Sequence, residues 1–218
     1  MNARLKIDFV SDVSCPWCAI GLASLEKAIA RLDGKVSVDL RFQPFELNPR
    51  MPSGGQDVTE HLTEKYGSTP EQQAQIRETI RQRGADVGFA FNAAGRGRIW
   101  NTFDAHRLLH WAAVEHPALQ PALKKALLVA YHGQARSMES HDVLLDVAGQ
   151  VGLPLERAQA ILASDEFAQD VREHEAFYTG HGIRSVPAVV INDRHLISGG
   201  QPPEVFEQAL RQIASDAA

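Results

Sequence analysis

The only two cysteines of this 218-residue chain lie in one short motif, Cys15-Pro16-Trp17-Cys18. Residues 5–10 before it alternate as a strand does, and residues 16–32 after it carry apolar side chains at helical spacing. The motif is therefore expected where a strand passes into the first turn of a helix. Two intervening residues allow the sulfurs to close a small ring, so the pair can change between dithiol and disulfide with little backbone movement. This pattern favours the making, breaking or exchange of disulfides.

The position of each cysteine predicts its role. Cys15 falls at the expected N-cap, where free backbone N–H groups and the helix dipole stabilise a thiolate. Pro16 suits the first helical position, because no partner is lost with its missing N–H. Cys18 lies one turn deeper on the same face. We expect Cys15 to attack a disulfide and the less exposed Cys18 to resolve the mixed disulfide.

Charge and hydropathy exclude two classes of protein. A formal net charge of −5 argues against nucleic-acid binding, which normally requires a basic surface. No apolar stretch approaches the roughly 20 residues needed to cross a bilayer. The N-terminal segment interleaves charged with apolar residues and lacks the apolar core of roughly 7–15 residues of a secretory signal. We therefore expect a cytoplasmic protein, in which a C-x-x-C pair is more often catalytic or metal-binding than structural.

The spacing of apolar residues predicts a β-α-β unit, a long helical block and a β-β-α unit. Strands are expected at residues 5–10, 36–42, 186–192 and 195–198. Helices are expected at residues 16–32, 57–66, 70–83, 101–115, 118–132, 140–151, 154–163 and 165–179, and from 203 to about 213. Gly34 is expected to stop the first helix, and residues 84–98 to form an extended or looping link.

Two other interpretations of the cysteine pair stay open. A C-x-x-C motif is half of a zinc site, and His106 and His110 have the i, i+4 spacing of paired ligands. No second close-set pair lies at ordinary zinc-module spacing, however, which weakens this interpretation. An inert pair of buried thiols is the other, and Pro16 and Trp17 between them favour a helix mouth instead.

The order of elements, with C-x-x-C after the first strand and Val186-Pro187 opening the third, resembles the thioredoxin superfamily. The closer similarity is to its DsbA-like branch. Within that branch, segments 11–21, 101–108 and 183–191 look like cytoplasmic FrnE-type proteins, relatives of 2-hydroxychromene-2-carboxylate isomerase. The resemblance implies an α/β fold with a thioredoxin-like domain at 1–48 and 180–218 and an all-helical insertion at 49–179.

The resemblance also implies an activity, that of a thiol:disulfide oxidoreductase cycling Cys15 and Cys18 on protein or small-molecule thiols and disulfides. It implies a cis Val186–Pro187 bond beside the pair, where the Val186 backbone binds a substrate strand and Pro187 keeps metal ions from bridging the thiols. No tightly bound cofactor is required, and glutathione or a protein dithiol could recycle the pair.

One position departs from the pattern of the superfamily. Thioredoxins usually carry a buried carboxylate six residues before the first cysteine, and Phe9 stands there. No general base for the resolving thiol can therefore be assigned from the sequence.

The active site is expected in the cleft between the two domains. Candidates for a substrate groove are Asp12, Trp100, Asn101 and Phe103. Each also has a structural explanation: Asp12 and Asn101 as caps, and the two aromatic residues as core. Trp17 is expected either to pack over the helix end or to hold substrate. His106 and His110 are expected as polar groups on an interface.

Two rival functions remain. One is a glutathione-dependent isomerase or transferase, in which Cys15 is not redox-cycled; such isomerases commonly carry serine at that position. The other is a thiol-gated interaction or metal-sensing module. The sequence leaves open the physiological substrate, the reduction potential, the net direction of exchange and the oligomeric state.

Overall fold

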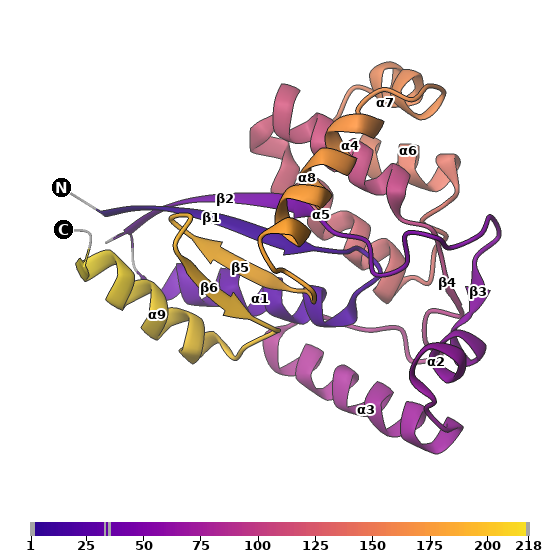
Figure 1. Ribbon diagram of the computed structural model, residues 1–218, viewed down its shortest axis with the longest axis horizontal. Helices are drawn as coiled ribbons and strands as arrows, with labels where there is room; N and C mark the ends of the chain where they lie inside the picture. The colour runs from indigo at the N-terminus through magenta and orange to yellow at the C-terminus, as the bar shows by residue number, and fades with distance from the viewer. Residues whose placement is uncertain (1–2, 33, 35, 217–218) are drawn as a thin grey trace.

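A computed structural model of the protein describes residues 3–32, 34 and 36–216 (Figure 1). The ends of the predicted thioredoxin-like domain at 1–2 and 217–218 lie outside these residues, as do residues 33 and 35 beside Gly34. A four-stranded sheet has the order β2-β1-β5-β6. Its strands are β1 (Ala3–Ser11), β2 (Val36–Pro44), β5 (Ala188–Ile191) and β6 (His195–Ser198). β1 pairs parallel with β2 and antiparallel with β5, and β5 and β6 form an antiparallel hairpin.

Strand β1 is buried on the face formed by Leu5, Ile7 and Phe9, which are each 0% exposed. Phe9 pairs with Phe42 of β2, and their rings meet edge to face with centroids 5.8 Å apart. The position where the resemblance would place a carboxylate is therefore filled by an aromatic contact in the core.

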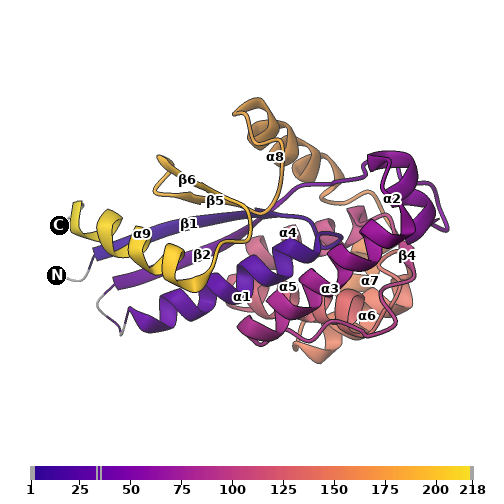
Figure 2. The ribbon, with the colours of Figure 1, turned by 90° about the horizontal axis from the view of Figure 1, so that it is seen from below.

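Two helices flank the sheet on the side of the cysteine motif. α1 (Pro16–Arg31) and α9 (Pro203–Asp216) pack against each other. α8 (Ala168–Gly180) lies on the opposite side of the sheet from α1 (Figure 2). Cys15 and Cys18 belong to one buried cluster with β1 and α9 residues such as Phe9 and Phe206. The sulfurs are thus part of the thioredoxin-like core, as expected from a motif at the strand–helix junction.

The segment between β2 and β5 is helical apart from a ladder of two-residue strands, β3 and β4. Its elements are β3 (Gln56–Asp57), α2 (Val58–Tyr66), α3 (Pro70–Val87), β4 (Arg98–Ile99), α4 (Phe103–Glu115), α5 (Gln120–Leu128), α6 (His141–Gln150), α7 (Leu155–Leu162) and α8 (Ala168–Gly180). α4, α5 and α8 pack against β2. The domain boundaries at 48/49 and 179/180 stay a prediction.

Several expected bounds differ from the structure. α3 runs through Gly84 to Val87, because the Phe91 ring packs where a Cβ of Gly84 would lie, and Gly88 ends the helix with φ +84°. The expected helix 118–132 is divided into a 3₁₀ turn, α5 and a π-helical turn at Val129–Gly133. The expected link 84–98 therefore begins four residues late and ends in β4.

At Gly21, helix α1 packs closely against the loop that contains Pro187. A Cβ at Gly21 would lie 3.0 Å from Pro187 Cγ and 3.2 Å from the Gly200 Cα. The absence of a side chain at Gly21 therefore allows the cysteine helix to lie against the Pro187 loop.

Gly21→Ala should destabilise the protein relative to Gly180→Ala by about 1–3 kcal/mol, because the added methyl group overpacks this contact. Gly180 is the matched control: it also lies in a helix, and a Cβ there meets nothing within 4 Å. Urea unfolding of both variants measures the difference. Equal stabilities would show that the contact has room for a methyl group.

Candidate active site at the cysteine pair

Cys15 is the N-cap of α1, with extended backbone angles (φ −90°, ψ 115°), and Pro16 begins the helix. Cys15 is 4% exposed and Cys18 is 0% exposed. Both cysteines are free thiols. Cys15 is thus the more exposed of the two cysteines, as expected, although both are buried.

The pKa values of the two thiols are shifted in opposite directions. The hydrogen bond from the Cys18 thiol lowers the pKa of Cys15, and the backbone N–H groups of Cys18 and Trp17 act in the same direction, against burial and the negative charge of Asp12. Burial, together with the hydrogen bond and charge of Cys15, raises the pKa of Cys18 well above its usual value. The pair thus carries its thiolate on Cys15, the sulfur nearer the helix mouth.

The Val186–Pro187 peptide bond is cis and lies beside the pair, as the family resemblance implies. The Cys15 Sγ lies 3.6 Å from the Val186 carbonyl oxygen, to which Cys15 donates a hydrogen bond when it is protonated. Pro187 is buried and Val186 is half-buried. The backbone of Val186 therefore faces the attacking sulfur directly.

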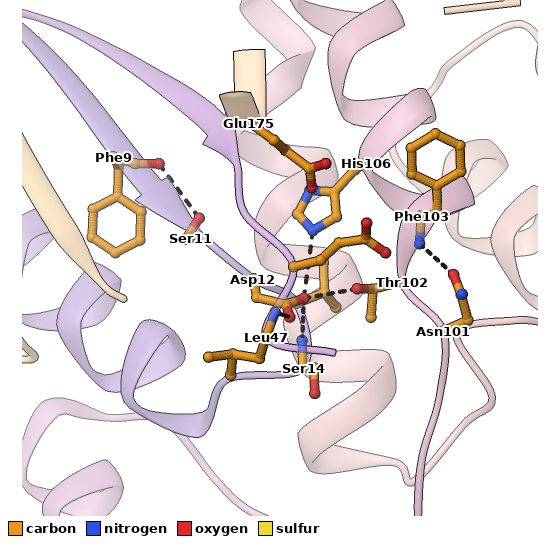
Figure 3. A network of polar contacts seen from close by, with 12 residues as sticks. Phe9, Ser11, Asp12, Ser14, Leu47, Asn101, Thr102, Phe103, His106 and Glu175 are labelled. Carbon is orange, nitrogen blue, oxygen red and sulfur yellow. Dashed lines mark hydrogen bonds and ion pairs between the residues drawn. The ribbon is translucent and has the colours of Figure 1, made fainter. Parts of the chain in front are cut away.

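Asp12 anchors the loop that leads to Cys15, by contacts that Figure 3 shows. Its Oδ1 accepts hydrogen bonds from the Ser14 N–H at 3.0 Å, the Thr102 hydroxyl at 2.9 Å and His106 Nε2 at 3.4 Å. Its Oδ2 accepts from the Leu47 N–H at 2.7 Å. Burial opposes the charge of the Asp12 carboxylate, but His106 and the two backbone donors outweigh it and lower its pKa.

The next two residues are held by the segment between β2 and β5 as well. The Val13 carbonyl accepts from His132 Nε2 at 2.9 Å, and the Ser14 carbonyl accepts from the Arg96 guanidinium. The Val13 side chain belongs to a buried cluster whose other members lie between β2 and β5. Residues 12–14 therefore each receive a hydrogen bond from the segment inserted between β2 and β5.

The structure does not bring the four groove candidates together around the sulfurs. Asp12 is 1% exposed and fully engaged in the network above, so it lines no open groove. Trp100 is half-buried, with the Arg98 guanidinium 5.6 Å from its ring. The Asn101 amide donates to the Met51 carbonyl and accepts from the Phe103 N–H, which is the capping role expected as its alternative.

Phe103 is half-buried under the Arg172 guanidinium, which lies 3.8 Å from its ring centroid. Trp17 is half-buried and packs against the cluster that contains both sulfurs, although part of its ring remains accessible. Trp100 and Phe103, the aromatic groove candidates, are therefore chiefly packed against other side chains.

A cavity of about 560 Å³ instead reaches the motif at Pro16. It is bounded by α2, α3, the segment 91–97 and His132, and its lining includes Arg77 and Arg96 but not Trp100, Asn101 or Phe103. The segment 91–97 lies within the link expected at residues 84–98 and folds back against α3, so the spacing of apolar residues does not predict this cavity.

His106 and His110 have different partners. His106 donates to Asp12, whereas the His110 ring packs against Phe167 and His174 with centroids 5.3 and 5.1 Å away. In residues 3–32, 34 and 36–216, no group of three or more His, Cys, Asp or Glu side chains is placed to hold a metal ion. Within the same residues, every helix is too short or too polar to serve as a bilayer-spanning segment.

His132 provides a test of the contact with residues 12–14. Burial and the nearby Arg96 lower its pKa from 6.5 to about 3, so the folded state keeps the ring neutral where the unfolded state is protonated. Stability should therefore fall as the pH decreases from 6.5 toward 3, by about 1.4 kcal/mol per pH unit more steeply in the wild type than in His132→Gln. Unfolding free energies of both proteins across this interval measure the difference, and parallel slopes would contradict it.

Known proteins resemble this chain over most of its length. A relative from Bacillus subtilis, YwbO, is 26% identical over 212 residues, covering 96% of this chain and 96% of that protein. The crystal structure of a probable DsbA oxidoreductase from Streptomyces coelicolor is 34% identical, with a TM-score of 0.85, and the match covers 98% of this chain and 91% of that one.

Two more distant structures share the fold. One is 2-hydroxychromene-2-carboxylate isomerase, at 12% identity and a TM-score of 0.72, covering 97% of each chain. The other is the cytosolic disulfide reductase DsbM from Pseudomonas aeruginosa with GSH, at 16% identity and a TM-score of 0.66, covering 96% of this chain and 99% of that one. At these identities the likeness shows the fold alone. The model of the DSBA-like thioredoxin domain matches residues 6–211, and the chain therefore belongs to that family.

Proposed function

We propose that the protein is a thiol:disulfide oxidoreductase that cycles Cys15 and Cys18 between dithiol and disulfide. The observation that carries this proposal is the placement of the two sulfurs within one helical turn: Cys15 is the N-cap of α1, and Cys18 is buried one turn deeper. The hydrogen bond from Cys18 lowers the pKa of Cys15, and burial raises the pKa of Cys18, in keeping with this placement. Cys15 is thereby suited to attack a substrate disulfide, and Cys18 to resolve the mixed disulfide afterwards.

The reaction proceeds in two exchanges. The Cys15 thiolate attacks one sulfur of a substrate disulfide, and the other substrate sulfur leaves as a thiolate. Cys18, once deprotonated, attacks Cys15, forms the Cys15–Cys18 disulfide and releases the second substrate thiolate. Two electrons have passed from the protein dithiol to the substrate. Two molecules of a thiol such as glutathione restore the protein dithiol by two further exchanges and leave as their own disulfide.

The cavity beside Pro16 supports a small acidic thiol as co-substrate. Arg77 and Arg96 line it, and guanidinium groups bind carboxylates such as those of glutathione. The cis Val186–Pro187 segment supplies backbone groups for a substrate strand once substrate displaces the Cys15 hydrogen bond. We place this activity in the cytoplasm, with no bound cofactor.

Cys15→Ser should abolish exchange in glutathione redox buffers, because serine is a poor nucleophile toward sulfur. Cys18→Ser should stop multiple turnover but accumulate a mixed disulfide on Cys15, since the resolving sulfur is missing. Disulfide reduction assays and intact-protein mass measure both outcomes.

The same variants separate the rival functions. Glutathione-dependent isomerisation that survives in Cys18→Ser, with no exchange in the wild type, would favour the isomerase. A wild type without either activity would favour an interaction module. Full exchange activity in Cys15→Ser would place the chemistry elsewhere.

A further inference from the structure

The exchange cycle requires Cys18 to lose a proton in a place where water does not reach it. Cys18 is 0% exposed, and its neighbour Phe9 is an apolar residue in the same cluster. Burial holds Cys18 in the thiol form. A proton acceptor near Cys18 is therefore needed for the second exchange, and the inference below rests on the proposed function.

Lys124 is a buried basic residue that could accept the proton of Cys18. It lies in α5, is 0% exposed, and its Nζ has no hydrogen-bond partner among the described residues. An unpaired buried amine is costly, so its presence in a core calls for a role or a compensating charge.

The face of α5 that carries Lys124 is directed at the sheet and the sulfurs. One turn earlier, Gln120 accepts from the Phe42 N–H at 3.1 Å and donates to the Phe42 carbonyl at 3.0 Å. One turn later, Leu128 lies in the buried cluster with Cys15 and Cys18. Residues at i and i+4 share a face, so Lys124 lies between these two contacts, within electrostatic range of Cys18.

We propose that the neutral amine of Lys124 accepts the proton of Cys18 when Cys18 resolves the mixed disulfide. Burial lowers the pKa of Lys124, and the negative charge of a Cys18 thiolate raises it again, so the amine becomes more basic as the sulfur ionises. Once Lys124 holds the proton, its positive charge in turn stabilises the Cys18 thiolate and lowers the pKa of Cys18 against its burial. A buried lysine of this kind can serve as a general base.

The step balances in protons and electrons. The Cys18 S–H proton moves to Lys124 Nζ, and the freed sulfur electron pair forms the bond to Cys15 as the bond from Cys15 to the substrate sulfur breaks. The substrate leaves as a thiolate and takes a proton from solvent. Because no direct hydrogen bond joins Lys124 to Cys18, a swing of the lysine chain or one water carries the proton.

The proton can then leave through a cavity of about 380 Å³ that Lys124 lines. This cavity lies between β2 and helices α4, α5 and α8, and its polar lining includes His106, His110, His174 and Gln120. Its volume accommodates several waters. The ammonium therefore has a polar route away from the sulfurs.

Other titratable groups also face Lys124 and belong in the interpretation of its pH dependence. Asp12 at the end of β1 and His132 in the π-helical turn interact electrostatically with it. Asp39 and Arg41 of β2 line the same cavity, with the three histidines of α4 and α8 named above. Matched variants that differ only at Lys124 cancel these contributions.

The first test is the titration of Cys18 as the sole thiol. In a Cys15→Ser background, Lys124→Met should raise the midpoint of thiolate absorbance by at least about one pH unit, a tenfold loss of thiolate. Lys125→Met is the control: Lys125 is exposed and pairs with Glu26 instead, and it should leave the midpoint unchanged. An unchanged midpoint in Lys124→Met would overturn the proposal.

The second test separates a proton acceptor from a fixed charge. Rates of mixed-disulfide resolution at pH 7 should fall at least about tenfold in Lys124→Met and in Lys124→Arg, since a guanidinium stays protonated. Full speed in Lys124→Arg would mean that charge alone suffices and would overturn the acceptor role. Lys124→Gln replaces the methionine variant if that protein does not fold. Failure of the proposed function is distinct, because the wild type itself would then show no exchange.

Discussion

The loop that leads to the cysteines is fixed by hydrogen bonds from the segment between β2 and β5. Asp12 accepts from Thr102 and His106, and the carbonyls of the next two residues accept from His132 and Arg96. All these donors lie between β2 and β5, whereas the loop follows β1. The segment between β2 and β5 therefore has a structural task at the site: its hydrogen bonds hold residues 12–14, and α1 begins directly after them with Cys15 as its N-cap.

The chemistry of the pair depends on that fixed helix start. Backbone N–H groups stabilise the Cys15 anion only while the first turn keeps its geometry, and Cys18 stays a thiol only while the core around it excludes water. Gly21 allows α1 to lie against Pro187, which brings Val186 opposite the attacking sulfur. Lys124 of α5 then supplies a buried basic group, whereas basic residues of β1 and α1 such as Lys6 and Lys27 are not buried.

Much of the fold could be predicted from the sequence, because its signals are local. The alternation in β1, the helical stripe of α1 and the cysteine motif between them lie within one stretch of chain and were read correctly. Errors arose where distant residues decide the outcome. Gly84 lies in α3, and the Phe91 ring packs against it. Asp12 is buried, and its carboxylate accepts hydrogen bonds from Thr102 and His106. No spacing along the chain connects Lys124 with Cys18.

The central claim is that Cys15 carries the thiolate and Cys18 does not. Its most direct measurement is alkylation of the reduced wild-type protein across a pH series, with each cysteine quantified by peptide mass spectrometry. The account predicts that Cys15 is modified with a midpoint below the value of about 8.5 of a free cysteine, while Cys18 stays unmodified. Equal modification of both cysteines, or a Cys15 midpoint at or above that value, would contradict it.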